Sequence, residues 1–140
     1  CRMIIARGTI YHPLKAQLEG APNTVFLPSE SPLAARRHWI ATSLKASGAI
    51  VVDAGAAKAM HAGKNLLAAG ITGVDGRFKH GDAVRVLGPD GAQIARGITS
   101  YGAEETRLLM GHASADIEAT LGFTRGNAII HSDDLVLVDA

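Results

Sequence analysis

The sequence predicts a mainly β fold with short helices. A small barrel or pseudo-barrel is expected over residues 48–140, after a strand-helix-strand remnant of an α/β domain at 1–28 and a basic linker at 29–47. Two observations predict the barrel. Fourteen of the 16 glycines lie from Gly48 onward, at intervals that suit turns between short strands. With 47% hydrophobic but only 4% aromatic residues, the core must consist mostly of Val, Ile, Leu and Ala.

The first 28 residues read as strand, helix and strand. The apolar run Met3–Ala6 suits a buried strand of a parallel sheet. A helix is expected over residues 12–18, with Pro13 in its first turn and Gly20 as its stop. Residues 24–27 form the second strand. Three such elements are too few for a domain, and the chain begins without Met, so we expect a C-terminal piece of a longer protein.

The linker carries a helix start and a basic patch. Ser31 can cap a helix that has Pro32 at its first position. The following segment, residues 33–45, contains Arg36-Arg37-His38, and Trp39 and Ile40 are expected to anchor it against a flanking domain. The boundary to the barrel is placed at residues 46–48.

The barrel opens with a strand at residues 49–52 and a short helix. Asp53 stands at the N-cap position of that helix, where its carboxylate accepts from free backbone amides. Gly63 suits the residue after its end, and a glycine-rich return follows. Residues 83–87 alternate, with Val84 and Val86 on one face and Arg85 on the other.

A hairpin and two helices complete the predicted barrel. Gly88-Pro89-Asp90-Gly91 is a turn that returns the chain into a strand over residues 93–99. One helix has Glu104 and Glu105 in its first turn, and the next has Ser114 as its cap and Gly122 as its stop. Residues 128–130 and 135–138 are closing strands, joined by a turn at 131–134.

Charge and cysteine content restrict the function classes. Residues 1–46 carry a net charge of +4 and residues 47–140 a net charge of −3. Cys1 is the only cysteine, which excludes an internal disulfide and a cysteine-based zinc site. No apolar run reaches membrane-spanning length, and no signal-peptide pattern occurs. We therefore expect a cytoplasmic protein with no membrane partner.

Several segments resemble known binding or catalytic motifs, but the spacing of their residues does not match those motifs. Gly63-Lys64 lacks the earlier glycine and the following Ser or Thr of a phosphate-binding loop, and Gly70, Gly73 and Gly76 do not fit a dinucleotide fingerprint. The six histidines show no metal-ligand pairing. In His131-Ser132-Asp133-Asp134, neighbouring side chains point to opposite faces, so a turn is favoured over a catalytic relay or a cation site. No catalytic, cofactor-binding or metal-binding residue is predicted.

A nucleic-acid site has limited support. The basic residues Lys64, Arg77 and Lys79 surround the glycine-rich return and are the candidate RNA-binding residues. Against this, the barrel region is net negative and poor in the aromatic residues on which bases stack. A solvated basic edge is the simpler interpretation.

The barrel region resembles a PUA domain, a pseudo-barrel found in many RNA-modifying enzymes. The matching segments are Val52-Asp53-Ala54-Gly55-Ala56, Gly63-Lys64-Asn65-Leu66-Leu67, Gly70-Ile71, Phe78, Gly81-Asp82-Ala83-Val84 and Ile94-Ala95-Arg96-Gly97.

The flanking segments resemble the bacterial glutamate 5-kinase family. They are Met3–Gly8, Asn23–Pro28, Arg36–Ala41, Gly111–Ile117, Leu121–Phe123 and Ile130–Leu137, although Ser132 stands where that family more often has Arg. The resemblance covers essentially the whole chain and assigns the first segment to the end of an amino acid kinase domain.

This resemblance implies a parent kinase that uses ATP and Mg²⁺ to phosphorylate the γ-carboxylate of L-glutamate, at the start of proline biosynthesis. It places the catalytic residues upstream of Cys1, so the chain itself is expected to be inactive and to serve a regulatory or structural role. Two further hypotheses stay open: an RNA-binding module, and an interaction domain that holds a homo-oligomer or transmits feedback.

Overall fold

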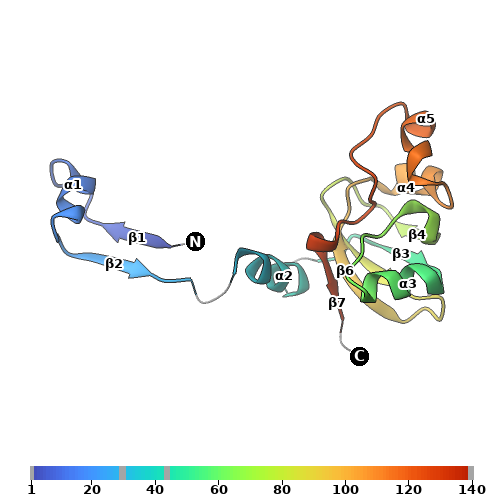
Figure 1. The fold of residues 1–140 in the computed structure, drawn as a ribbon, viewed down its shortest axis with the longest axis horizontal. Coiled ribbons are helices and arrows are strands. Elements are labelled where there is room, and N and C mark those ends of the chain that lie inside the picture. Colours follow the sequence, from blue (N-terminus) through green and yellow to red (C-terminus); the bar gives the residue numbers. More distant parts are fainter. Residues whose placement is uncertain (1, 29–30, 43–44, 139–140) are drawn as a thin grey trace. The chain divides into compact units, whose positions relative to one another are not determined.

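The computed structural model describes residues 2–28, 31–42 and 45–138 (Figure 1). Cys1 and the start of the predicted linker at 29–30 lie outside the described residues. The chain divides into two compact units, Cys1–Ala35 and Arg36–Ala140, and each is considered by itself. This division lies inside the predicted linker, whose boundaries at 28/29 and 47/48 stay predictions.

The first unit is a two-stranded ribbon with a helix in its connection. Strand β1 (Met3–Ala6) pairs antiparallel with β2 (Asn23–Phe26), and α1 (Pro13–Leu18) lies between them in the sequence. Gly20, at φ +92°, follows the end of α1 as predicted. The expectation of a buried strand in a parallel sheet is wrong for this structure. A two-stranded ribbon has no second layer, so Ile5 stays 57% exposed despite its apolar run.

Helix α2 (Pro32–Thr42) begins as predicted. The Ser31 hydroxyl accepts from the amide of Ala34 at 3.2 Å, and Pro32 is the first helical residue. Of the expected anchor pair, Ile40 is fully buried but Trp39 is 48% exposed. The anchor is therefore a single aliphatic side chain, and it belongs to the second unit.

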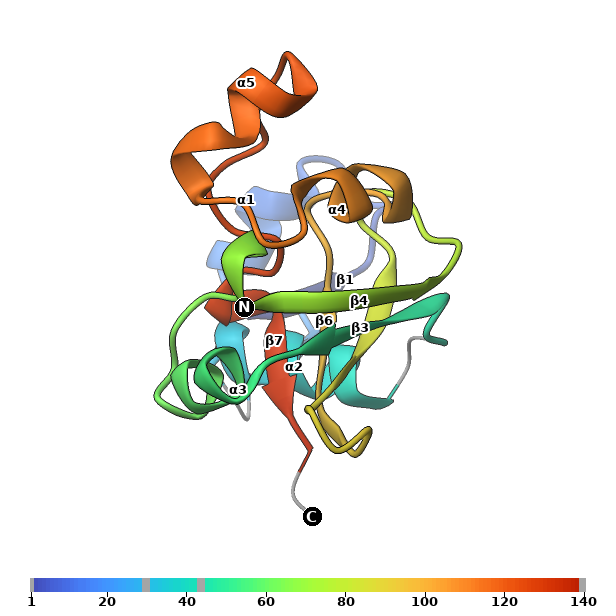
Figure 2. The ribbon, with the colours of Figure 1, turned by 90° about the vertical axis from the view of Figure 1, so that its right-hand side faces the viewer.

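The second unit is built on a mixed five-stranded sheet in the order β4-β3-β5-β6-β7. The sheet curls around one core, with α3 and α4 near its two ends (Figure 2). Strand β3 pairs parallel with β5, and the other neighbours pair antiparallel. The strands are β3 (Gly48–Val52), β4 (Ile71–Gly76), β5 (Ala83–Leu87), β6 (Gln93–Ile98) and β7 (Leu135–Leu137). This confirms the predicted mainly β fold.

Apolar and polar side chains alternate along β5, and the apolar ones point into the core. Val84 and Val86 are fully buried while Arg85 between them is exposed, as predicted. Ile50 and Val52 lie on the neighbouring strand and join the same cluster. The core is aliphatic apart from Phe78 and Tyr101, as the composition requires.

The helices follow their sequence signals closely. Helix α3 (Ala54–His61) is capped by Asp53, whose Oδ1 accepts from the amide of Ala56 at 2.7 Å. Gly63 follows α3 at φ +76°, which confirms its interpretation as a helix-end glycine. Helices α4 (Ala103–Leu109) and α5 (Ile117–Leu121) form the predicted pair. Ser114 does not cap α5: it begins a short 3₁₀ turn, η2 (Ser114–Asp116), and Asp116 stands at the N-cap of α5.

The closing segment is tied to the middle of the chain. The predicted strand at 128–130 is a single bridge between Leu66 and Ile130, because only one register position pairs there. The amide of Leu66 donates to the carbonyl of Ile130 at 2.9 Å, and the amide of Ser132 donates to Asn65 Oδ1 at 2.8 Å. The turn expected at 131–134 contains the 3₁₀ turn η3 (Ser132–Asp134).

No helix in the described parts of the chain combines the length and the apolar character needed to cross a membrane.

Candidate functional site

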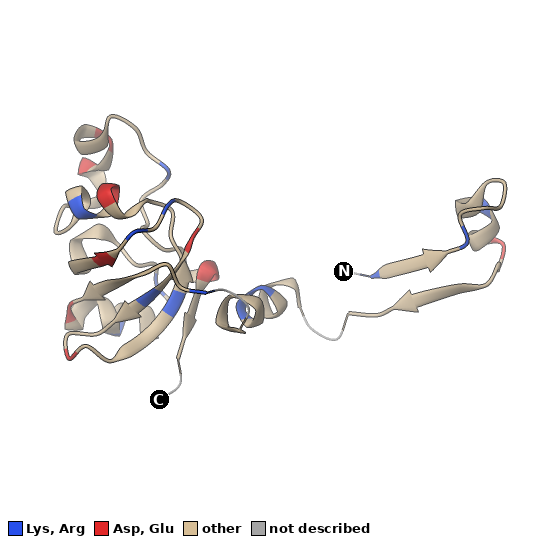
Figure 3. Ribbon diagram, turned by 180° about the vertical axis from the view of Figure 1, so that it is seen from behind, with Lys and Arg blue, Asp and Glu red and all other residues tan. Residues whose placement is uncertain are grey.

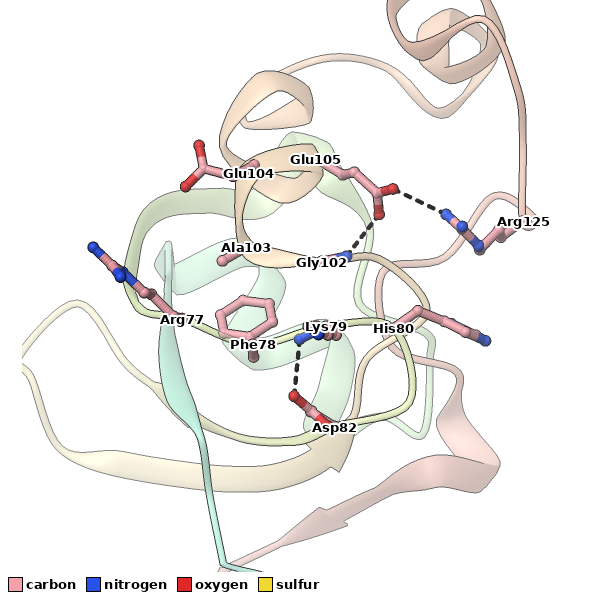
Figure 4. A pocket seen from close by; sticks show the side chains of 10 residues that line it. All are labelled: Arg77, Phe78, Lys79, His80, Asp82, Gly102, Ala103, Glu104, Glu105 and Arg125. Atoms are coloured by element: carbon pink, nitrogen blue, oxygen red, sulfur yellow. Dashed lines mark hydrogen bonds and ion pairs between the residues drawn. The ribbon is translucent and has the colours of Figure 1, made fainter.

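One surface hollow of the second unit lies between the segment 77–82 and the start of α4 (Figure 4). We call it the Phe78 hollow, and its volume is about 570 Å³. Ten residues line it: Arg77, Phe78, Lys79, His80, Asp82, Gly102, Ala103, Glu104, Glu105 and Arg125. Phe78 is only 5% exposed, so its ring belongs to both the hollow and the core.

The acidic side chains of this hollow already have partners. Glu105 accepts from the amide of Gly102 at 2.7 Å through one oxygen and from Arg125 at 3.1 Å through the other. Asp82 accepts from the amide of Lys79 at 2.9 Å. Glu104 is paired with Arg107 at 2.6 Å. None of these carboxylates is left without a donor.

A second hollow lies beside α3 and the glycine-rich return that precedes β4. We call it the Lys64 hollow; its volume is about 490 Å³. It is lined by Asp53, Gly55, Ala56, Ala59, Lys64, Asn65, Leu67, Ala69 and Gly70. A Cβ at Gly70 would lie 2.4 Å from the Cβ of Ala56, so a glycine is needed where the return crosses α3. Lys64 is exposed at this hollow, and Asn65 is fixed by its bond to Ser132.

The three candidate RNA-binding residues therefore do not share one hollow. Lys64 lines the second hollow, whereas Arg77 and Lys79 line the first. In the view of Figure 3, acidic and basic residues are interspersed over the second unit. RNA binding by these residues stays a prediction.

Sequence reasoning missed Arg125 as part of the Phe78 hollow. It lies 46 positions after Lys79 and reaches the hollow through Glu105. Its guanidinium also lies over the Phe123 ring, 4.6 Å from the centroid, and its amide donates to Tyr101 Oη at 2.8 Å. No local pattern in the sequence signals the contacts with Glu105 and Tyr101, because these residues precede Arg125 by 20 and 24 positions.

The turn 131–134 binds other parts of the protein. Asp134 accepts from Arg36 at 2.6 Å, and the carboxylate of Asp133 lies 3.5 Å from His131 Nδ1. The two carboxylates thus have separate partners. Within the described ranges, no three His, Cys, Asp or Glu side chains are arranged to hold a metal ion.

A curled, mixed five-stranded sheet with short helices defines a small pseudo-barrel module. The family model described as the PUA domain matches residues 48–121, more than half of the chain. The chain therefore belongs to the PUA-domain family, and the predicted resemblance to that family is confirmed.

The chain is also similar to glutamate 5-kinases along its whole length. It is 50% identical to the enzyme of Agrobacterium fabrum over 140 residues, which are 100% of this chain and 36% of that protein. It is 53% identical to the enzyme of Dinoroseobacter shibae over 137 residues, which are 98% of this chain and 37% of that protein. The chain thus spans little more than a third of the curated relatives it matches, and the resemblance to the glutamate 5-kinase family is confirmed.

Among solved structures, a PUA domain from Aeropyrum pernix K1, crystallised with tartrate, is 26% identical at a TM-score of 0.46. That match covers 61% of this chain and 41% of the other. It is a partial likeness and carries no weight in the assignment.

Proposed function

We propose that this chain is part of a glutamate 5-kinase. Such a transferase uses ATP to convert L-glutamate to L-glutamyl 5-phosphate, the first step of proline biosynthesis. The observation that carries the proposal is the identity of 50% and 53% to two glutamate 5-kinases along essentially the whole chain. The ribbon of the first unit agrees with a segment that belongs to a larger kinase domain, because its apolar strands lack a covering layer.

Within that parent, we assign a structural or regulatory role to the PUA module and none in catalysis. The ATP, Mg²⁺ and glutamate sites would lie in the kinase domain, whose upstream part is the partner of this chain. Phosphoryl transfer needs cationic groups and a metal ion around the transferred phosphate. The parent is expected to work in the cytoplasm, without a membrane partner.

The experiment compares the full-length parent with the 140-residue chain. Each protein is incubated with ATP, Mg²⁺ and L-glutamate, and the acyl phosphate is trapped as a hydroxamate. The full-length protein should give a glutamate-dependent product, and the 140-residue chain should give none. A folded full-length protein without this activity would contradict the proposed parent, while activity of the short chain would contradict the proposed role.

A role in assembly can be tested separately. If the module holds a homo-oligomer, sedimentation of the full-length protein should give a larger assembly than a version lacking residues 48–140. If it transmits feedback, that truncation should change inhibition by proline. Equal assembly and equal inhibition in both proteins would remove this role.

The second candidate function is RNA binding, and one specific observation favours it. Lys64 is exposed at a hollow of about 490 Å³ beside the fixed amide side chain of Asn65. A lysine at such a rim is placed to contact a phosphate, and that contact weakens as salt rises. Gel shifts with a structured RNA at two salt concentrations test this.

Lys64→Glu should weaken RNA binding, whereas Lys58→Glu is the matched control. Lys58 is an exposed lysine of α3 that does not line the hollow. Absence of binding at low salt, or equal losses in both variants, would rule out an RNA site at Lys64.

A further inference from the structure

The Phe78 hollow has the size and lining of a small-molecule site. Its volume of about 570 Å³ falls within the roughly 300–1,000 Å³ typical of ligand pockets. Phe78 and Ala103 line it with the small part of their apolar surface that is exposed, 5% and 4%, and charged side chains surround them (Figure 4). The question is which charge a ligand would have to bring.

Ion pairing within the hollow leaves an excess of one positive charge among the side chains that have no ion pair in the described parts of the chain. Each of its carboxylates is bound by a donor of the protein, as described above. Arg125 forms an ion pair with Glu105. Arg77 and Lys79, by contrast, form no ion pair with any described residue. Asp82 also forms no ion pair within the described residues, since its donor is the uncharged Lys79 amide, so the side chains of the hollow that lack an ion pair carry two positive charges and one negative charge.

His80 adds a donor or acceptor at the same place. Its Nδ1 lies 2.9 Å from the carbonyl oxygen of Ser100. Because a carbonyl oxygen can only accept, Nδ1 must carry the hydrogen in this contact. The other ring nitrogen, Nε2, is left for a ligand or for water.

The segment that carries these groups is held rigidly. The amide of Gly81, at φ +86°, donates to the carbonyl of Thr99 at 2.8 Å, and the amide of Ala103 donates to the carbonyl of Phe78 at 2.9 Å. The bond from the Lys79 amide to Asp82 closes the turn. A ligand would therefore not have to order this backbone, which lowers the entropic cost of binding.

We propose that the Phe78 hollow binds a small organic anion with a carboxylate or phosphate group. The oxyanion would be bound by Arg77 and Lys79, and the carbon skeleton would rest on Phe78 and Ala103. This site is separate from the Lys64 hollow and goes beyond the proposed function. Its binding can be measured whether or not the parent proves to be a kinase.

The test follows backbone amide NMR shifts of the 140-residue chain at constant ionic strength. The probes are benzoate, phenyl phosphate, inorganic phosphate and the neutral analogue benzyl alcohol. Benzoate and phenyl phosphate should give saturable shifts centred on residues 77–82 and 102–105. Inorganic phosphate should bind more weakly because it lacks the apolar part, and benzyl alcohol should not saturate.

Substitutions distinguish binding of the anion in the hollow from its general attraction to positively charged side chains. Arg77→Ala with Lys79→Ala should raise the Kd for phenyl phosphate by at least about tenfold, because both positive groups that would donate charge-assisted hydrogen bonds to the oxyanion are removed. Lys58→Ala with Arg85→Ala removes the same charge from exposed positions outside the hollow and should leave the Kd unchanged. The single variant Arg77→Gln, at an exposed position, provides a second test should the double variant unfold.

Several outcomes would overturn the proposal. They are shifts that do not saturate, equal shifts with benzyl alcohol and benzoate, and equal losses in the two double variants. Shifts of residues 77–82 with an RNA oligonucleotide but with none of the small anions would also overturn it, and would assign Arg77 and Lys79 to a polymer.

Discussion

Arg36 donates to Asp134, a residue 98 positions further along the chain, through both Nε and Nη2, each 2.6 Å from Oδ1. This contact joins helix α2 to the η3 turn. Two other bonds hold α2: Arg37 donates to the carbonyl of Ser132 in η3 at 3.5 Å, and Arg96 of β6 donates to the carbonyl of Ala41 at 2.8 Å. With Ile40 fully buried, the C-terminal half of α2 is part of the second unit.

Burial of Ile40 should stabilise the packing of α2 within the second unit more than the Arg36–Asp134 ion pair does. Arg36→Ala is expected to cost at most about 1 kcal/mol of unfolding free energy, because the Arg36 side chain is 52% exposed to solvent. Ile40→Ala should cost roughly 2–5 kcal/mol, through lost burial and a cavity. Urea unfolding of both variants checks this order. A larger loss for Arg36→Ala would show that the ion pair holds the helix.

At the N-cap of α3, Asn should be able to replace Asp53, whereas Ala should not. Asp53→Ala removes the acceptor of the Ala56 amide and should cost about 0.5–2 kcal/mol. Asp53→Asn keeps an acceptor of the same shape and should stay close to wild type. Thermal or urea unfolding gives both values. Equal losses for the two substitutions would mean that the charge, and not the hydrogen bond, stabilises α3.

Tyr101 should stabilise the segment that carries Arg125. Its hydroxyl donates to the carbonyl of Gly126 at 2.6 Å and accepts from the amide of Arg125 at 2.8 Å, while the residue is 0% exposed. Tyr101→Phe should cost about 1–3 kcal/mol, because buried polar groups lose their partner. Hydrogen exchange at the Arg125 amide should also accelerate. Tyr11→Phe is the matched control, since Tyr11 is 89% exposed and should show no change.

Gly97 should tolerate no side chain. A Cβ there would lie 2.7 Å from Ile130 Cγ2 and 2.9 Å from the carbonyl oxygen of Asp134. Gly97→Ala is therefore expected to cost about 1–3 kcal/mol by overpacking. Gly8→Ala, where a Cβ would meet nothing within 4 Å, is the comparison. A Gly97→Ala variant as stable as wild type in urea would show that the closing segment can shift away.

The fold could be predicted where local chemistry decides the structure. The Asp53 cap, the glycine ends of α3 and α5 and the hairpin turn at 88–91 all depend on neighbours within a few positions. Strand β4 has no such local signal, because the sequence there predicts only a return punctuated by glycines. It is a strand because it pairs antiparallel with β3, a long-range contact that no local pattern shows.

The candidate site could be predicted only in part, for the same reason. Its basic residues were found from charge, but their division between two hollows follows from the path of the chain around the core. The exposure of β1 is also not predictable from its sequence. An apolar run indicates that a strand has side chains to bury, but it does not show whether another element lies against them.

The bridge between Leu66 and Ile130 affects how the module folds while it is being synthesised. A ribosome releases β3, β4, β5 and β6 well before residues 129–137, yet these late residues pair with Leu66, supply β7 and carry the partner of Arg36. Until they emerge, the nascent sheet lacks one edge and α2 lacks its ion pair. The growing chain must therefore pass through a partly open state with exposed apolar surface, the kind of intermediate that chaperones bind during synthesis.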